Sequence, residues 1–188
     1  TTLFKWVMIF FDLCIIVVTF FLGIFFQGNF DFDYYYKELG MHIVLLPTLL
    51  IIWGVLLYYF GMYDSFRTKQ ILDILFIVAE TTLIGGSIFG SFIFITKIES
   101  VSRLHIFYSF SLAAIFISIE KIALILYFRY QRKKGLNTRN ILVVGTGKRT
   151  QYFANLIHKH SEWGIHVVGL VDEDVAKTNT ILYGHKVI

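Results

Sequence analysis

A glycine-rich turn near the C-terminal end is the stretch of this sequence best suited to chemistry. Gly145-Thr146-Gly147 follows a short β-branched run and precedes apolar residues at helical spacing, which predicts a strand, a tight turn and a helix. In such a turn the first glycine permits the bend and the second lets the backbone approach a pyrophosphate. The helix N-terminus adds N–H donors and positive potential. We therefore expect a nucleotide or another phosphate compound to bind here.

Polar residues around this turn extend the predicted site. Lys148 offers charge suited to phosphates, and Asp172 ends the next apolar run, where a carboxylate could accept hydrogen bonds from ribose hydroxyls. Thr150 stands where the G-x-G-x-x-G fingerprint has its third glycine, the position that packs helix against strand, and it departs from the fingerprint. The predicted cofactor-binding residues are Gly145, Gly147, Lys148, Thr150 and Asp172. In the alternative interpretation the glycines only make the turn and Asp172 is a solvated strand-end residue.

The sequence offers no catalytic or metal site to accompany the turn. We identify no nucleophile, no positioned acid/base pair and no metal cluster, and the six histidines are scattered. The one cysteine, Cys14, lies in an apolar run, so it forms neither an internal disulfide nor a thiolate metal cluster. We therefore assign no catalytic residue and no metal ligand.

The residues around the turn, 140–188, are predicted to form the first part of an α/β domain. A strand at Ile141–Val144, a helix ended by Gly164 and a second strand at Ile165–Val171 form one βαβ unit, and Tyr183–Ile188 is typical of the approach to a third strand. Such a unit is right-handed, and its parallel strands are covered on both faces. We expect a Rossmann-like fold of the kind that binds CoA or NAD, continuing in a longer protein.

The rest of the chain has the composition of a membrane protein. Apolar residues make up 56% of the sequence and charged residues 16%, where soluble proteins carry about 25% charged residues. Four apolar runs are long enough to cross about 30 Å of hydrocarbon as helices. The runs are Leu3–Phe26, Met41–Tyr59, Ile71–Ile95 and Leu104–Phe128, joined by loops at Gln27–Gly40, Phe60–Gln70 and Thr96–Arg103. We predict a four-helix transmembrane domain at 1–128.

A basic hinge at 129–139 separates the two regions. Residues 1–128 hold seven Lys/Arg and nine Asp/Glu, whereas residues 129–188 hold ten and four. Basic residues concentrate on the cytoplasmic flanks of membrane spans, and counting them by side places both termini in the cytoplasm. The hinge can contact anionic lipid headgroups, whereas binding to nucleic acid is not expected.

Ionisable and small residues within the spans predict contacts between helices. Burying Asp12, Glu80, Glu120 or Lys121 in hydrocarbon costs several kcal/mol, so each needs a partner, and we expect pairing between helices. A role in handling a lipid-linked substrate is the alternative. Small residues in the third span permit close helix packing, either inside one bundle or in a homo-oligomer. They are Gly85, Gly86, Ser87, Gly90 and Ser91.

Three segments carry a resemblance to a known family: FGMY at 60–63, GLNTRNILVVGTGKRTQYFANLI at 135–157 and WGIHVVGLVDED at 163–174. Together with four spans they resemble the N-terminal half of bacterial polyprenyl-phosphate hexose-1-phosphate transferases (undecaprenyl-phosphate glycosylphosphotransferases), which start exopolysaccharide, O-antigen or capsule synthesis. In that family a re-entrant helix and a catalytic domain with an Asp-Glu pair follow, and this sequence has no positions for them. The resemblance implies a multi-pass protein of the bacterial inner membrane.

The activity that the resemblance implies belongs to a parent enzyme. That enzyme moves a sugar-1-phosphate from a UDP-sugar to undecaprenyl phosphate and releases UMP, with Mg²⁺ needed by the absent catalytic domain. This chain is then its non-catalytic part, which anchors, assembles or senses a nucleotide or nucleotide-sugar. A similar front half occurs in membrane-bound nucleotide-sugar epimerases and dehydratases, although GLNTRN and the Glu162-Trp163-Gly164 turn look more like the transferases. A nucleotide-sensing channel or transporter is the third class, but no carbonyl-filter sequence is present.

Overall fold

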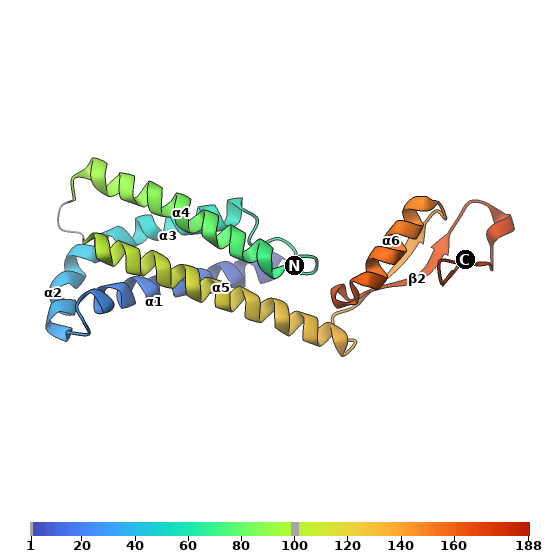
Figure 1. Ribbon diagram of the computed structural model, residues 1–188, viewed down its shortest axis with the longest axis horizontal. Coiled ribbons are helices and arrows are strands. Elements are labelled where there is room, and N and C mark those ends of the chain that lie inside the picture. The colour runs from blue at the N-terminus through green and yellow to red at the C-terminus, as the bar shows by residue number, and fades with distance from the viewer. Residues whose placement is uncertain (1, 99–101) are drawn as a thin grey trace. The chain divides into compact units, whose positions relative to one another are not determined.

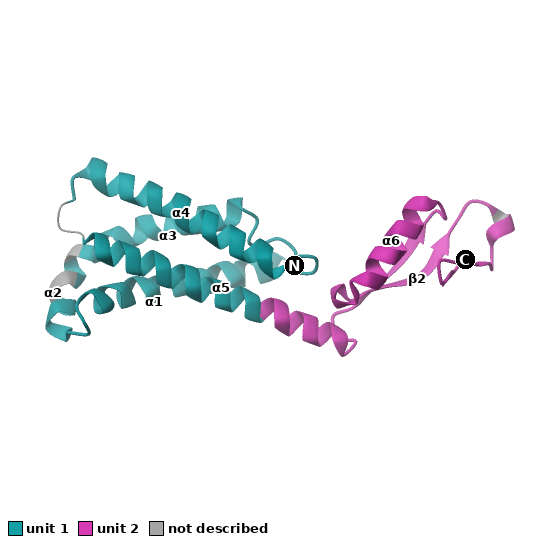
Figure 2. Ribbon diagram, viewed as in Figure 1, with its two compact units in different colours: residues 1–123 teal, residues 124–188 magenta. Residues whose placement is uncertain are grey.

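Two compact units make up the chain, residues 1–123 and 124–188 (Figure 2). The computed structural model describes residues 2–98 and 102–188. The expected loop Thr96–Arg103 therefore lies partly outside the described residues, at positions 99–101. The division between the units falls within the last long helix.

The first unit is helical (Figure 1). Among the described residues, three helices that lie wholly or partly in this unit are long and apolar enough to cross a membrane, with 26, 26 and 31 residues: α1 (Thr2–Gln27), α4 (Ile71–Thr96) and α5 (Arg103–Lys133). The second expected span instead consists of a 3₁₀ turn, η1 (Ile43–Leu45), followed by the shorter α3 (Leu46–Tyr59). The chain is thus a candidate membrane protein with three long apolar helices, and the count of four spans stays a prediction.

A helix occupies most of the expected first loop. The segment Gln27–Gly40 contains the start of α2 (Phe32–His42), which begins at an Asp31 N-cap whose side chain accepts a hydrogen bond from Asp33 N at 2.9 Å. Aromatic packing holds α2 against the end of α1, since the Phe25 and Tyr35 rings lie 5.9 Å apart. An N-cap aspartate supplies an acceptor that the first turn of a helix lacks. This local cap explains why a polar, aromatic segment is helical here.

The small residues of the third span differ in whether α4 buries or exposes them. A Cβ on Gly85 would lie 3.3 Å from side-chain atoms of both Ile52 and Leu56 on α3, so this glycine allows the two helices to approach closely. Ser87, Gly90 and Ser91 instead lie on the exposed face of α4. Gly85 therefore serves packing inside the bundle.

The expected pairing of buried charges is confirmed between α1 and α5. Lys121 Nζ lies 2.7 Å from Asp12 Oδ1 and 2.8 Å from Glu120 Oε2. The Lys121 and Asp12 side chains are 0% and 1% exposed, whereas Glu120 is 25% exposed. Glu80 lies on the exposed face of α4. The lysine therefore ties two helices through a fully buried ion pair.

The second unit contains a small α/β region beyond the end of α5. Two parallel strands, β1 (Arg139–Val144) and β2 (Ile165–Val171), flank α6 (Lys148–Lys159), whose buried residues pack against β2. The face of the strands that carries Leu142, Val144 and Val168 is exposed, so covering on both faces is not achieved within the described residues.

The expected third strand forms a hairpin. Its strands β3 (Ile181–Leu182) and β4 (His185–Lys186) are antiparallel, and their turn contains Tyr183 and Gly184, both with positive φ. A single parallel bridge joins Val187 to Leu170 of β2. The region thus has a strand–helix–strand core, and a complete Rossmann fold stays a prediction.

Gly164, which directly precedes β2, packs against Arg132 near the C-terminal end of α5. It follows the 3₁₀ turn η2 (Ser161–Trp163) with a φ of +61°, and a Cβ there would lie 2.9 Å from Arg132 Cγ. The Arg132 guanidinium donates to Glu162 O at 3.2 Å. This close approach docks the basic end of α5 on the turn before β2.

Replacing Gly164 by alanine is expected to loosen this contact. The left-handed backbone costs an alanine roughly 1–2 kcal/mol, and the clash with Arg132 adds about 1 kcal/mol or more. Gly135→Ala is the matched control, because Gly135 has a φ of +77° but nothing within 4 Å of a Cβ. Hydrogen exchange of the β2 amides measures the difference. Equal losses of protection in both variants would show that the Arg132 contact contributes nothing.

Candidate phosphate-binding site

The glycine turn, Gly145-Thr146-Gly147, connects β1 to α6. Gly145 has a φ of +93°, which a glycine adopts at no steric cost, and its N–H donates to Val171 O at 2.6 Å. Gly147 is the N-cap of α6 and makes no side-chain capping hydrogen bond. The first N–H groups of a helix have no acceptor within the helix, so this end of α6 can donate to an anion.

The two glycines differ in what the fold requires of them. Gly145 is needed for its backbone conformation, whereas Gly147 has the ordinary values φ −75° and ψ −180°. A Cβ on Gly147 would meet nothing within 4 Å. The fold of this chain therefore does not require a glycine at 147, and the missing side chain leaves the backbone open at the helix N-terminus. This matches the second glycine of the dinucleotide-binding turn, which admits a pyrophosphate.

Thr150 braces the turn from the first turn of α6. Its side chain is buried, and Thr150 Oγ1 donates to Gly145 O at 2.9 Å. The threonine in the place of the third glycine thus makes a hydrogen bond to the turn. Lys148, two residues earlier, has an exposed side chain in the first turn of α6.

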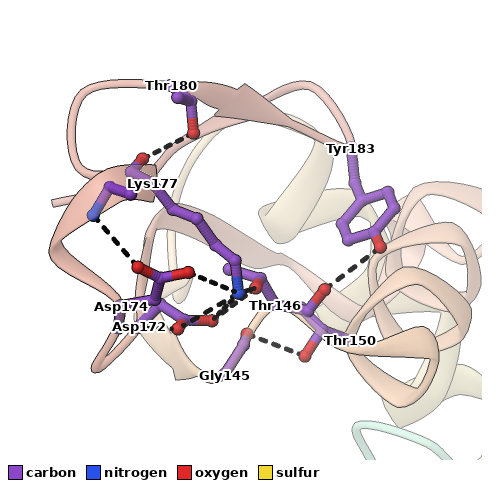
Figure 3. A network of polar contacts seen from close by, with 9 residues as sticks. Gly145, Thr146, Thr150, Asp172, Asp174, Lys177, Thr180 and Tyr183 are labelled. Carbon is purple, nitrogen blue, oxygen red and sulfur yellow. Dashed lines mark hydrogen bonds and ion pairs between the residues drawn. The ribbon is translucent and has the colours of Figure 1, made fainter.

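Asp172, at the end of β2, lies beside the glycine turn (Figure 3). The Thr146 hydroxyl donates to Asp172 Oδ2, and the backbone N–H of Asp174 donates to Asp172 Oδ1 at 3.0 Å. Lys177 Nζ lies 3.4 Å from Asp172 Oδ1 and 3.2 Å from Thr146 Oγ1. The structure therefore brings Gly145, Gly147, Thr150 and Asp172 to one end of the strands, together with a lysine that the sequence analysis did not single out.

The contacts of Asp172 keep its carboxylate ionised. The hydrogen bond from Thr146 and that from the Asp174 N–H lower the pKa of Asp172 to about 2. Because the folded-state pKa lies below the ordinary value of about 3.9, this group contributes stability above that value. The contribution disappears as the pH falls through about 2. Near neutral pH the Asp172 carboxylate therefore carries a full negative charge.

A hairpin residue also contacts the turn. Tyr183 OH donates to Thr146 O at 3.1 Å, from 37 positions further along the chain. In the described part of the chain, no three His, Cys, Asp or Glu side chains lie together in a way that could hold a metal ion. The hydrogen bond of Tyr183 thus ties the hairpin to the backbone of the glycine turn.

Comparison with known proteins gives one family. The model of a CoA-binding domain matches residues 58–182, which make up well over half of the chain. The matched region includes α4 and α5 as well as β1, α6 and β2, and it contains every predicted site residue. No curated protein matches the chain.

Proposed function

Because the chain belongs to the CoA-binding domain family, we propose that its α/β region binds a nucleotide through a pyrophosphate held at the glycine turn. Gly147 carries the proposal. Its backbone has ordinary angles and open space beside it, at the N-terminus of a helix with no side-chain cap. A glycine that the fold does not need is explained by a ligand that approaches the backbone closely. The ligand classes are CoA, another nucleoside diphosphate, or a nucleotide-sugar.

We further propose that this nucleotide-binding region belongs to a membrane sugar transferase. Domains of this family are found in polyprenyl-phosphate sugar transferases and nucleotide-sugar-related proteins. The long apolar helices α4 and α5 lie inside the matched region, so the family unit combines membrane-type helices with the α/β region. The chain then anchors the enzyme in the bacterial inner membrane, with both termini cytoplasmic, and senses a nucleotide. Catalysis resides outside these residues.

Direct binding tests the first proposal. The chain is reconstituted in lipid nanodiscs and titrated by calorimetry with CoA, ADP, UDP-glucose and inorganic pyrophosphate. Saturable binding of at least one compound with a stoichiometry near one is expected. If none binds at millimolar concentration, the glycine turn is structural and the proposal is wrong.

Release of UMP tests the second proposal. Membranes carrying the full-length protein receive UDP-sugars with and without undecaprenyl phosphate. In the proposed reaction the sugar-1-phosphate passes to the lipid phosphate and UMP leaves, so UMP appears only when the lipid is present. Epimerised or dehydrated sugar nucleotide without UMP would instead assign the parent protein to the nucleotide-sugar epimerases and dehydratases.

A further inference from the structure

Lys177 lies against the glycine turn, although it is 31 residues away from Thr146 in the sequence. It ends the 3₁₀ turn η3 (Val175–Lys177), and its Nζ is 3.2 Å from Thr146 Oγ1. Figure 3 shows its side chain reaching from this turn towards Thr146 and Asp172. The cation thus lies beside Thr146 of the glycine turn, at which the proposed function, on which this inference rests, places a pyrophosphate.

We propose that Lys177 is a ligand-binding residue whose ammonium group contacts the pyrophosphate held at the glycine turn. The ammonium pairs with Asp172 at 3.4 Å and Asp174 at 3.7 Å. These distances are longer than those of a close ion pair, about 2.7–2.9 Å. The lysine side chain is also 41% exposed. A phosphate oxygen at the turn can therefore accept a hydrogen bond from the Lys177 ammonium after a movement of the lysine side chain alone.

The backbone around Lys177 is fixed, so its side chain starts from a defined place. Lys177 N donates to Asp174 O at 3.0 Å, and Lys177 O accepts from both Thr180 N at 3.0 Å and Thr180 Oγ1 at 2.5 Å. Further along the same segment, Tyr183 OH donates to Thr146 O. The segment is thus tied to the turn at both ends. A binding group held in place before the ligand arrives loses less conformational entropy on binding.

The contacts of Asp172 favour a positioning role for this carboxylate over the ribose contact expected from the sequence. Its oxygens already accept from the Thr146 hydroxyl, the Asp174 N–H and the Lys177 ammonium. Ribose hydroxyls that donate to this carboxylate would compete with these donors. We therefore assign Asp172 the role of positioning Lys177 and Thr146, and recognition depends on the phosphates of the ligand.

Affinity measurements on lysine variants test the contact. ADP and adenosine are titrated against the nanodisc-embedded chain carrying Lys177→Met, Lys177→Arg or Lys159→Met. Loss of one charge-assisted hydrogen bond lowers ADP affinity about 10- to 100-fold in Lys177→Met. The weak affinity for adenosine is unchanged, and Lys177→Arg keeps most of the ADP affinity. Lys159→Met is the matched control, because Lys159 ends α6 at its opposite terminus with an exposed side chain.

The Asp172→Asn variant separates a positioning role of this residue from ribose binding by which ligand is affected. If Asp172 positions Lys177 and Thr146 for the phosphates, removal of its charge lowers ADP affinity and leaves the affinity for adenosine unchanged. If Asp172 binds ribose, affinity for ADP and adenosine falls together, by about tenfold or more, and that result would overturn the inference.

Failure of the lysine contact and failure of the proposed function give different results in these binding measurements. A wild-type chain that binds none of the phosphate compounds overturns both. A wild-type chain that binds ADP, with Lys177→Met within twofold of it, overturns the lysine contact alone. Equal loss of ADP and adenosine affinity in Lys177→Met also overturns it, because a distorted fold affects both ligands alike.

Discussion

Replacing Lys121 by methionine is expected to destabilise the helical bundle by about 3–5 kcal/mol, the usual cost of removing one partner from a buried ion pair. Asp12 is 1% exposed, and its Oδ1 accepts from Lys121 Nζ at 2.7 Å. Without the lysine, this carboxylate remains buried with its strongest partner gone. Unfolding of the chain in detergent micelles, followed by helical circular dichroism, measures the effect.

Two controls identify the cause of the loss. Lys5→Met removes a lysine whose Nζ lies 3.7 Å from Asp64, with the two side chains 47% and 72% exposed. An exposed pair contributes about 0–1 kcal/mol. The double variant Asp12→Leu with Lys121→Met removes both buried charges and should regain most of the stability. If the double variant is as unstable as Lys121→Met, the destabilisation comes from lost packing.

Regular elements of the α/β region could be predicted because their signals are local. The strand Ile165–Val171 was expected with the bounds that β2 has, since its apolar run ends at acidic residues and begins after Gly164. The pairing of Lys121 with Asp12 could be expected for another reason. A charge in an apolar helix has few alternatives to a partner at similar depth. In both cases one strong physical requirement decides the outcome.

Features that depend on several weak signals could not be predicted. Helix α2 rests on a single cap at Asp31 and on aromatic contacts with α1, and the polar composition of its segment favours a loop. The pairing of Lys177 with Asp172 depends on the path of the chain after β2, where the approach to the expected third strand includes the hairpin β3–β4. Position in the sequence does not reveal that path. The only sequence feature that indicates this pairing is a lysine five residues after a strand-end aspartate.

Replacing Gly147 by valine is expected to abolish nucleotide binding and leave the α/β region folded. The valine side chain would occupy the space in which a pyrophosphate approaches the turn, and we expect affinity for ADP to fall by at least about 100-fold. The fold should tolerate the change, because a φ of −75° suits any residue and no atom beyond the two neighbouring residues lies within 4 Å of the new Cβ. Calorimetry measures binding, and hydrogen exchange of the β1 amides measures folding.

Two further variants decide what the glycine turn is for. Gly147→Ala adds a smaller group and should reduce affinity less than Gly147→Val, since the effect grows with the volume of the side chain at the helix N-terminus. Gly145→Ala should instead lower protection of β1, because its φ of +93° disfavours any side chain. A Gly147→Val chain that binds ADP as tightly as the wild type would mean that the open space at residue 147 does not receive the ligand. The turn would then only connect β1 to α6, and the family's binding site would have to lie elsewhere in residues 58–182.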